Sequence, residues 1–377
     1  MEGRIRLREP QITPVEGGFL LSDPYGVFGK PLALTEGGLF LLSLMEGKTL
    51  EEVQEEVFKA HGILVPRKEL EDLLKALEEA GLLLTEGVER RLKEEEERLR
   101  KERPMRLAGL SYPEGEEEAR AFWEAFRASF PGPRPQGSPS ILLLPHLEPS
   151  RVPEAYGAAL ATLEGIPEPE RVYLVGVAHR PLKERAAALP VPFHTPFGPA
   201  EPDLEALQAL DALLPYELFN TPLAFREEHS LELPLFFLKR AFPQAKVLPL
   251  LVGRRSPELG EALKVVLKDF PGLLVLAVDL SHVGPRFGDK PFSRPLAEEA
   301  RKRDLGFLER LAQGEPEAAL AFLGGNPTRV DAVEVVASLI PLLTGRKGQV
   351  LAYRLDLEAP TLSAVGAGTL VFPTLPG

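Results

Sequence analysis

The C-terminal two thirds of the chain contain short, strongly apolar segments separated by helical stretches, and this alternation restricts the fold more than any other feature. The segments read SILLLPH, RVYLVGVAH, KVLPLLVG and LLVLAVDLSH, and helices are expected near residues 152–163 and 257–269. Continuous apolar runs of this length are typical of strands that helices bury on both faces. Two final segments, GQVLAYRLD and LSAVGAGTLVF, have the alternation of an antiparallel pair. Residues 104–377 are therefore predicted to form an α/β domain with a mixed sheet flanked by helices.

Residues 1–86 have a different pattern and are predicted to form a small α+β domain. Short strands are expected in LLSDPYGVFGKPLAL, followed by three helices with an N-cap at Thr35, a capping box starting at Thr49 and a stop at Gly62. Three short helices followed by an apolar segment resemble a winged-helix domain. The stretch LTEGGLFLLSLMEGKTLEEV also resembles the peptide-recognition domain of the pyrroloquinoline quinone biosynthesis protein D type, which implies a protein or peptide partner. Residues 87–103 are dense in charges and are predicted to form a solvated connecting helix.

The composition excludes several classes of function. The chain has 44 Lys and Arg against 56 Asp and Glu, a net charge of −12, which argues against a nucleic-acid partner. It has no cysteine, which excludes disulfides, cysteine-ligated iron–sulfur clusters and cysteine nucleophiles. No uncharged apolar stretch approaches the ~20 residues of a membrane helix, and the first residues lack the apolar core of a signal peptide. We therefore expect a cytoplasmic protein without a membrane partner, and its many Glu, Arg, Leu and Pro residues are typical of a thermophilic source.

Three of the six histidines follow the ends of predicted strands. His146 comes after the first strand, His179 ends the second, and Asp279 and His282 follow LLVLAV. Ligands of open α/β sheets gather at the carboxyl ends of the strands, so these side chains are predicted to share a pocket. Neutral imidazole is the commonest protein ligand of transition metals, which makes the pocket a candidate metal site. The alternative for each histidine alone is a hydrogen-bonded structural role.

A charged cluster precedes an apolar helix in the segment EEHSLELPLFFL, residues 227–238. Pro234 is tolerated in the first turn of a helix, so the helix is predicted to begin close to Ser230 and to present His229 near its N-terminus. His229 and Glu232 are three residues apart, which places them on one face if the helix includes both. The alternative is a helix cap with a buried ion pair.

The segments EEHSLELPLFFL, VDLSHVG and LPLLVG together resemble the Memo family, whose bacterial and archaeal members include protein B of the AmmeMemoRadiSam system. RLAGLSYPEG and TPFG are similar to two further family motifs, so the resemblance runs from about residue 105 to the end of the chain. The family shares the fold of the class III extradiol ring-cleaving dioxygenases, and its cleft can bind iron or copper. The resemblance implies this fold and this kind of cleft for the larger domain.

The resemblance also implies a set of cleft residues. The residues that match the family's histidine ligands are His146, His179 and His282, with Asp279 and His229 at further cleft positions. The family's cysteine ligand is absent, and Asp331 lies near its position. A carboxylate in place of a thiolate favours harder ions such as Fe(II), Mn or Zn. Arg180 replaces the second histidine of the family's paired motif, which also fits a cleft that has diverged from the original chemistry.

Two functions are consistent with this set. In the first, the protein is a metal-dependent oxygenase or oxidase of an unknown small molecule, with iron, zinc or copper held by the three histidines and by Asp331 or Asp279. His229 then serves as acid or base and Glu232 orients it. Metal-assisted hydrolysis is a variant of this function. In the second, the protein is a non-catalytic adaptor that binds a peptide in the cleft or a protein partner through the N-terminal domain.

Overall fold

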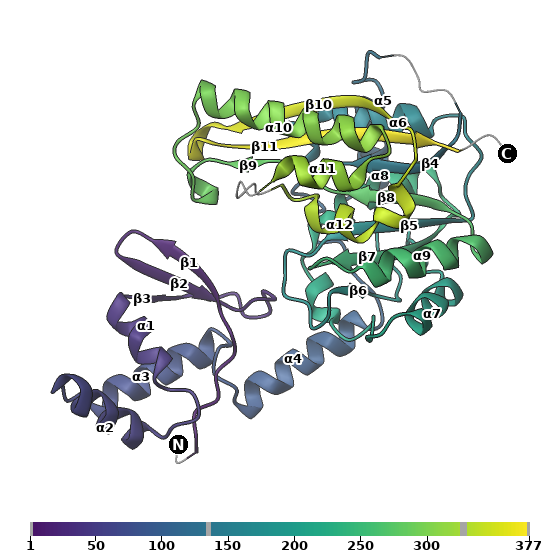
Figure 1. The fold of residues 1–377 in the computed structure, drawn as a ribbon. Coiled ribbons are helices and arrows are strands. Elements are labelled where there is room, and N and C mark those ends of the chain that lie inside the picture. The colour runs from purple at the N-terminus through teal and green to yellow at the C-terminus, as the bar shows by residue number, and fades with distance from the viewer. Residues whose placement is uncertain (1–2, 133–136, 325–329, 375–377) are drawn as a thin grey trace. The chain divides into compact units, whose positions relative to one another are not determined.

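The computed structural model describes residues 3–132, 137–324 and 330–374. The chain forms two compact units, Met1–Leu99 and Arg100–Gly377 (Figure 1). None of the helices within the described ranges combines the length and apolar character needed to cross a bilayer.

The first unit combines a small antiparallel sheet with helices. Its elements are β1 (Gln11–Val15), β2 (Gly18–Ser22), β3 (Leu32–Leu34), α1 (Glu36–Ser43), α2 (Leu50–His61), α3 (Arg67–Glu79) and α4 (Glu86–Leu99). The sheet order is β1-β2-β3. The predicted helix signals are confirmed: Thr35 caps α1, Thr49 forms the capping box of α2, and Gly62 ends α2 in the left-handed conformation. Buried leucines of α2 and α3 pack against β2 to form the core of this unit. The winged-helix likeness stays a prediction.

Helix α4 covers most of the segment predicted to be a connecting helix, and it is tied to the first unit. Glu89 forms an ion pair with Arg6. Arg91 donates a hydrogen bond to the carbonyl of Val27 and stacks over the ring of Phe28. These contacts explain why the helix belongs to the first unit despite its many charges.

The second unit is built on the predicted mixed sheet. Its strands are β4 (Pro139–Leu144), β5 (Arg171–Val177), β6 (Ala186–Ala188), β7 (Lys246–Val252), β8 (Leu273–Ala277), β9 (His282–Val283), β10 (Gln349–Glu358) and β11 (Ser363–Pro373). Their order is β10-β11-β4-β8-β5-β7-β6, and the short β9 pairs with β11. The four central strands run parallel, whereas β6 and the long β10–β11 pair run antiparallel to their neighbours. The predicted strands and the antiparallel pair are thus confirmed.

Helices cover both faces of this sheet (Figure 1). One face packs against α6 (Pro153–Leu163) and α8 (His229–Ala241), and α5 (Glu116–Arg127) packs on these two helices. The other face packs against α7 (Leu204–Leu213), α9 (Pro257–Asp269), α10 (Arg294–Ala312), α11 (Pro316–Leu323), α12 (Val333–Ser338) and α13 (Ile340–Leu343). Burial on both faces explains why the parallel strands are apolar along their whole length.

Candidate metal centre

The site lies at the carboxyl ends of three adjacent parallel strands. β8 lies between β4 and β5, so the residues that follow these strands emerge side by side. His146 follows β4, Asp279 follows β8 and His179 follows β5. A cleft of about 460 Å³ opens there, with apolar walls that include Val177 and Val365. The expectation of a shared pocket is met, because His146, His179, Asp279 and His282 all line this cleft.

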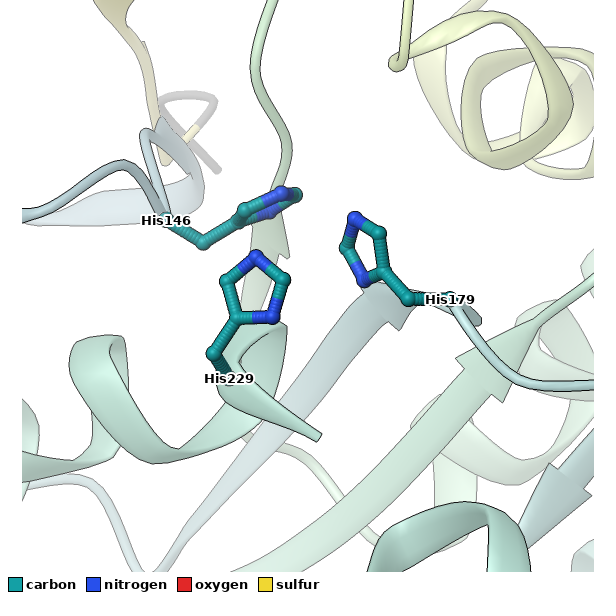
Figure 2. Close-up of side chains that lie close together, drawn as sticks. All are labelled: His146, His179 and His229. Atoms are coloured by element: carbon teal, nitrogen blue, oxygen red, sulfur yellow. The ribbon is translucent and has the colours of Figure 1, made fainter. Parts of the chain in front are cut away.

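Three histidine rings point toward one another in this cleft (Figure 2). Ring centroids are 5.1 Å apart for His146 and His179, 5.1 Å for His146 and His229, and 4.2 Å for His179 and His229. One ring nitrogen from each residue lies within 4.8 Å of the others, a spacing that can hold one metal ion. Among the residues that the structure describes, His229 therefore completes a three-histidine group with His146 and His179.

His146 is held between a carbonyl and two carboxylates. Its side chain is 1% exposed, and Nδ1 lies 2.9 Å from the carbonyl oxygen of Ala277. Nε2 lies 3.0 Å from Oδ2 of Asp331 and 3.6 Å from Oδ2 of Asp279. Burial alone would lower the pKa of His146, but the two carboxylates outweigh it and raise the pKa to about 10. The surroundings of Nε2 therefore favour a positive charge at this position.

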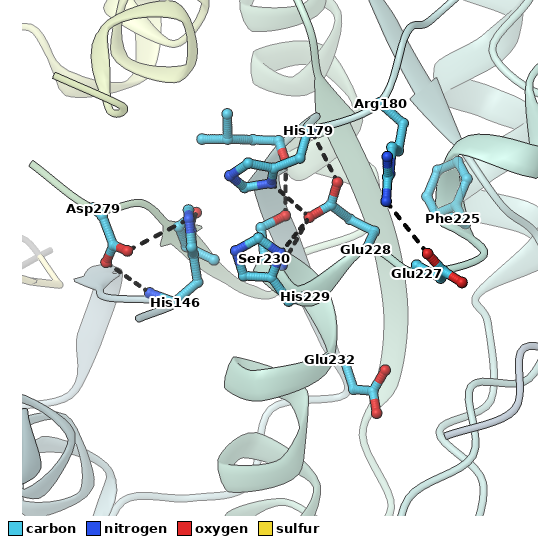
Figure 3. A network of polar contacts seen from close by, with 12 residues as sticks. His146, His179, Arg180, Phe225, Glu227, Glu228, His229, Ser230, Glu232 and Asp279 are labelled. Atoms are coloured by element: carbon cyan, nitrogen blue, oxygen red, sulfur yellow. Dashed lines mark hydrogen bonds and ion pairs between the residues drawn. The ribbon is translucent and has the colours of Figure 1, made fainter. Parts of the chain in front are cut away.

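Glu228 connects the other two histidines, and sequence reasoning did not single it out. Its buried carboxylate accepts hydrogen bonds from Nδ1 of His179 at 2.8 Å and from the amide of His179 at 2.9 Å (Figure 3). The same carboxylate lies 3.7 Å from Nδ1 of His229 and caps α8 by accepting the amide of Ser230 at 2.9 Å. Burial would raise the pKa of Glu228, but His179 and His229 outweigh it and lower the pKa to about 2. Glu228 is therefore an anion that orients both rings.

His229 is a neutral ligand candidate. Its side chain is 38% exposed toward the cleft. Burial, together with the nearby His146 and His179, lowers the pKa of His229 to about 3. A neutral imidazole is the form that binds metals. The position of His229 at the start of α8 acts in the same direction, because a helix N-terminus disfavours an imidazolium.

The start of α8 explains how His229 reaches the cleft. The helix begins at His229, one residue before the expected start, and Pro234 lies in its second turn rather than its first. Gly176 on β5 lets the helix approach closely, because a Cβ at Gly176 would lie 2.4 Å from Oγ of Ser230. Ser230 in turn donates a hydrogen bond to the carbonyl of Val177 at 2.8 Å.

The orienting role expected for Glu232 does not agree with its contacts. Glu232 is buried and points away from the three histidines (Figure 3). Its carboxylate binds donors from the segment that precedes α5, namely the guanidinium of Arg103, the amides of Arg106 and Leu107, and the hydroxyl of Tyr112. Glu232 therefore anchors that segment to α8. Glu228, next to His229 in the sequence, makes the contacts with cleft histidines that were expected of Glu232.

His282 lines the cleft but lies outside the three-histidine group. β9 pairs with β11, with His282 opposite Val365, and this pairing fixes the backbone of His282 on the cleft wall. Nδ1 lies 2.9 Å from the carbonyl of Leu280, so Nδ1 carries the proton, and the ring packs edge-on against Phe287. His282 thus lies in the predicted cleft, and its role as a metal ligand stays a prediction.

The two predicted aspartates lie beside His146. Oδ1 of Asp279 accepts the amides of His146 at 3.1 Å and Leu147 at 3.2 Å, which fixes the loop that carries the histidine. Asp331 lies shortly before α12 in the chain. Its side chain is 14% exposed and faces His146. Burial would raise the pKa of Asp331, but His146 outweighs it and lowers the pKa. Asp331 is therefore an ionised carboxylate beside the three rings.

The fold and the site define an α/β protein with a three-histidine candidate metal centre at the ends of its parallel strands. The family model described as Memo-like protein matches residues 103–371. The chain therefore belongs to the Memo-like protein family, and the resemblance inferred from its motifs is confirmed.

The relatives match more of the chain than the family model does. A MEMO1 family protein of Thermus thermophilus is 84% identical over 327 residues, which is 87% of this chain and 100% of that protein. A MEMO1 family protein of Aquifex aeolicus is 32% identical over 381 residues, which is 97% of this chain and 99% of that protein. An alignment over 97% of the chain includes most of the first unit, so the Aquifex relative carries both units.

Proposed function

We propose that the cleft binds one divalent transition metal ion and that the protein is a metal-dependent enzyme with oxygenase or oxidase activity. The observation that carries the proposal is the position of His146. Its Nδ1 must hold a proton because the carbonyl of Ala277 can only accept, whereas its Nε2 faces two carboxylate oxygens. A lone pair directed at carboxylates is repulsive, so Nε2 needs either a second proton or a metal ion.

The chemistry of the donors fits a metal ion. His146, His179 and His229 would hold it through imidazole nitrogens, and Asp331 would supply a carboxylate. Glu228 holds His179 through Nδ1, which leaves Nε2 of His179 for a metal. Carboxylate partners of this kind fix the orientation of ligand histidines and raise their basicity.

The donor set favours iron or zinc over copper. Three imidazoles with a carboxylate, and no cysteine in the chain, form a site of borderline to hard character. When bound, such an ion supplies redox or Lewis-acid chemistry to a substrate. The oxygenase assignment rests on the histidine and carboxylate donors together with the family's likeness to the extradiol enzymes.

The other cleft residues suggest roles toward a substrate. In the neutral form of the His282 ring the single proton is on Nδ1, beside the carbonyl of Leu280, so Nε2 of that form can accept a proton from a molecule in the cleft. We assign His282, in place of His229, the role of acid or base. Leu147, Val177 and Val365 supply apolar walls that exclude water from part of the cleft.

Elemental analysis of the purified chain tests the proposal. We expect about one equivalent of iron or zinc per chain after purification or anaerobic reconstitution with Fe(II). His146→Ala should abolish this binding, whereas His194→Ala should not, because His194 lies outside the cleft and pairs with Glu102. Failure to bind any of these ions, or equal loss in both variants, would refute the metal site and favour the adaptor function.

A further inference from the structure

A buried carboxyl group holds the segment that carries His282, although it does not line the cleft itself. Asp304 belongs to α10 and is 0% exposed. Its Oδ1 accepts hydrogen bonds from the amide of Ser281 at 3.1 Å and from the hydroxyl of Ser281 at 2.5 Å. Its Oδ2 accepts the hydroxyl of Tyr353 at 2.9 Å. A buried network with this many donors keeps its members in fixed positions.

Strand β11 holds the same segment through its backbone. The amide of Leu280 donates a hydrogen bond to the carbonyl of Gly366 at 2.7 Å, and the amide of Gly366 donates to the carbonyl of Ser281 at 2.8 Å. A Cβ at Gly366 would lie 2.1 Å from Oδ2 of Asp304, so a glycine at this position leaves room for the carboxyl group. Asp304 and β11 therefore fix one short segment between them.

The position of this segment decides how the ring of His282 lies. The carbonyl oxygen of Leu280 is 2.9 Å from Nδ1 of His282. The peptide unit that joins Leu280 to Ser281 carries both this carbonyl and the amide that donates to Asp304. Because a peptide unit is planar, a group that holds its N–H also fixes the direction of its C=O. Asp304 thus acts on the ring of His282 through a single peptide plane.

We infer that Asp304 is a positioning residue of the cleft: by holding the peptide unit between Leu280 and Ser281, it keeps the proton of His282 on Nδ1 and leaves Nε2 as the acceptor. Its meaning for catalysis rests on the proposed function, in which His282 is the acid or base, whereas the alignment of the ring does not. A purely structural Asp304 would stabilise the packing of α10 and would leave the tautomer of His282 unchanged.

Nitrogen-15 NMR of the histidine rings measures this tautomer, because ring nitrogens with and without a proton resonate far apart. We would study the full chain at pH 9 with EDTA present, where an ordinary imidazole is neutral and metal is withheld from the cleft. His282→Gln assigns the signals of His282. The signals are then compared in Asp304→Asn, which keeps an oxygen for both donors of Ser281, and in Asp304→Leu, which keeps none.

Asp203→Leu is the matched control for the loss of a buried carboxylate. Asp203 is 2% exposed and forms an ion pair with Arg171 at 2.8 Å, but it does not line the cleft. The unmodified chain, Asp304→Asn and Asp203→Leu should all show His282 with its proton on Nδ1. Asp304→Leu should lose this signal in favour of the Nε2–H tautomer, which free histidine favours in water.

Ser281→Ala keeps the inference testable if Asp304→Leu does not fold. This variant removes only the hydroxyl donor and should lose part of the Nδ1–H signal of His282. An unchanged tautomer in folded Asp304→Leu, or in Ser281→Ala where the leucine variant does not fold, would overturn the inference. A proton on Nε2 in the unmodified chain would also overturn it. Failure of the chain to bind a metal would refute the proposed metal site and would leave each of these results as it is.

Discussion

Nε2 of His146 lies 3.0 Å from Oδ2 of Asp331, while the opposite nitrogen of the same ring is held by a backbone carbonyl. This relationship makes the ring an imidazolium without metal, with its pKa raised to about 10 by Asp279 and Asp331 against the opposing effect of burial. A metal ion that binds Nε2 of His146 would therefore have to displace this proton.

Metal binding should release about one proton per ion near pH 7, because a metal can bind Nε2 of His146 only after its proton leaves. The apparent affinity should rise about tenfold per pH unit while the pH stays below the pKa of His146. Calorimetric titration with Zn(II) in buffers of different ionisation enthalpy measures the proton count. Asp331→Asn should lower the count, because it removes one of the carboxylates that raise the pKa of His146. A count of zero in the unmodified protein would contradict this prediction.

Glu228→Gln should weaken metal binding by about 10- to 100-fold, the usual effect of removing a carboxylate partner of ligand histidines. The variant keeps the size of the side chain but loses the charge that holds His179 and faces His229. Glu227→Gln is the matched control, because Glu227 is an exposed neighbour that pairs with Arg180 and Arg226. Competition with a fluorescent zinc chelator would measure both affinities. Equal affinities for the two variants would show that Glu228 does not support the ligands.

Glu232→Gln should lower the free energy of unfolding by about 3–5 kcal/mol, because it leaves the buried guanidinium of Arg103 without its anion. Metal affinity at temperatures where the variant is folded should change little, since Glu232 faces away from the histidines. Urea unfolding and metal titration of the same preparation separate these effects. A large loss of metal affinity in a stable variant would restore the orienting role for Glu232.

Asp304 should make the stability of the protein depend on pH. Its carboxyl group on α10 accepts hydrogen bonds from Ser281 and Tyr353, and burial raises its pKa from 3.8 to about 6. The folded state thus holds the proton more tightly than the unfolded chain. The contribution of this group is therefore fully present below pH 3.8 and is lost as the pH rises through 6.

Asp304→Asn removes this titration. The stability of the unmodified protein relative to the variant should fall on the order of 2–3 kcal/mol between pH 4 and 7, at about 1.4 kcal/mol per unit of pKa shift. Urea unfolding at intervals across this range measures the difference. Parallel stability curves for the two proteins would show that the carboxyl group of Asp304 has an ordinary pKa in the folded state.

The sequence was sufficient to predict the elements whose environment is uniform. The parallel strands are buried on both faces, so their apolar runs identify them, and His146 and His179 could be placed because each directly follows such a strand. The contacts of Glu232 could not be predicted, because its partners Arg103 and Tyr112 lie more than 100 residues away in the sequence. Its spacing of three residues from His229 carries no information about those partners.

His282 lines the cleft as expected, but its distance from the other histidines could not be predicted, for a related reason. Its position depends on the short pairing between β9 and β11, which joins segments far apart in the sequence and has no pattern of its own. Glu228 had a local signal, because a helix cap was the alternative that the sequence offered for this segment. An acidic residue immediately before a predicted helix is a common N-cap, and a cap of α8 necessarily lies beside the first residue of that helix, His229.

The carboxylate of Glu228 has a consequence for motion as well as for binding. One group closes the first turn of α8 and holds His179, so the turn cannot fray without releasing that ring. Local opening of this helix end and separation of the histidines of the candidate metal centre are therefore expected to occur together. A bound ion should accordingly slow hydrogen exchange at the amide of Ser230, far more than at the opposite end of the same helix.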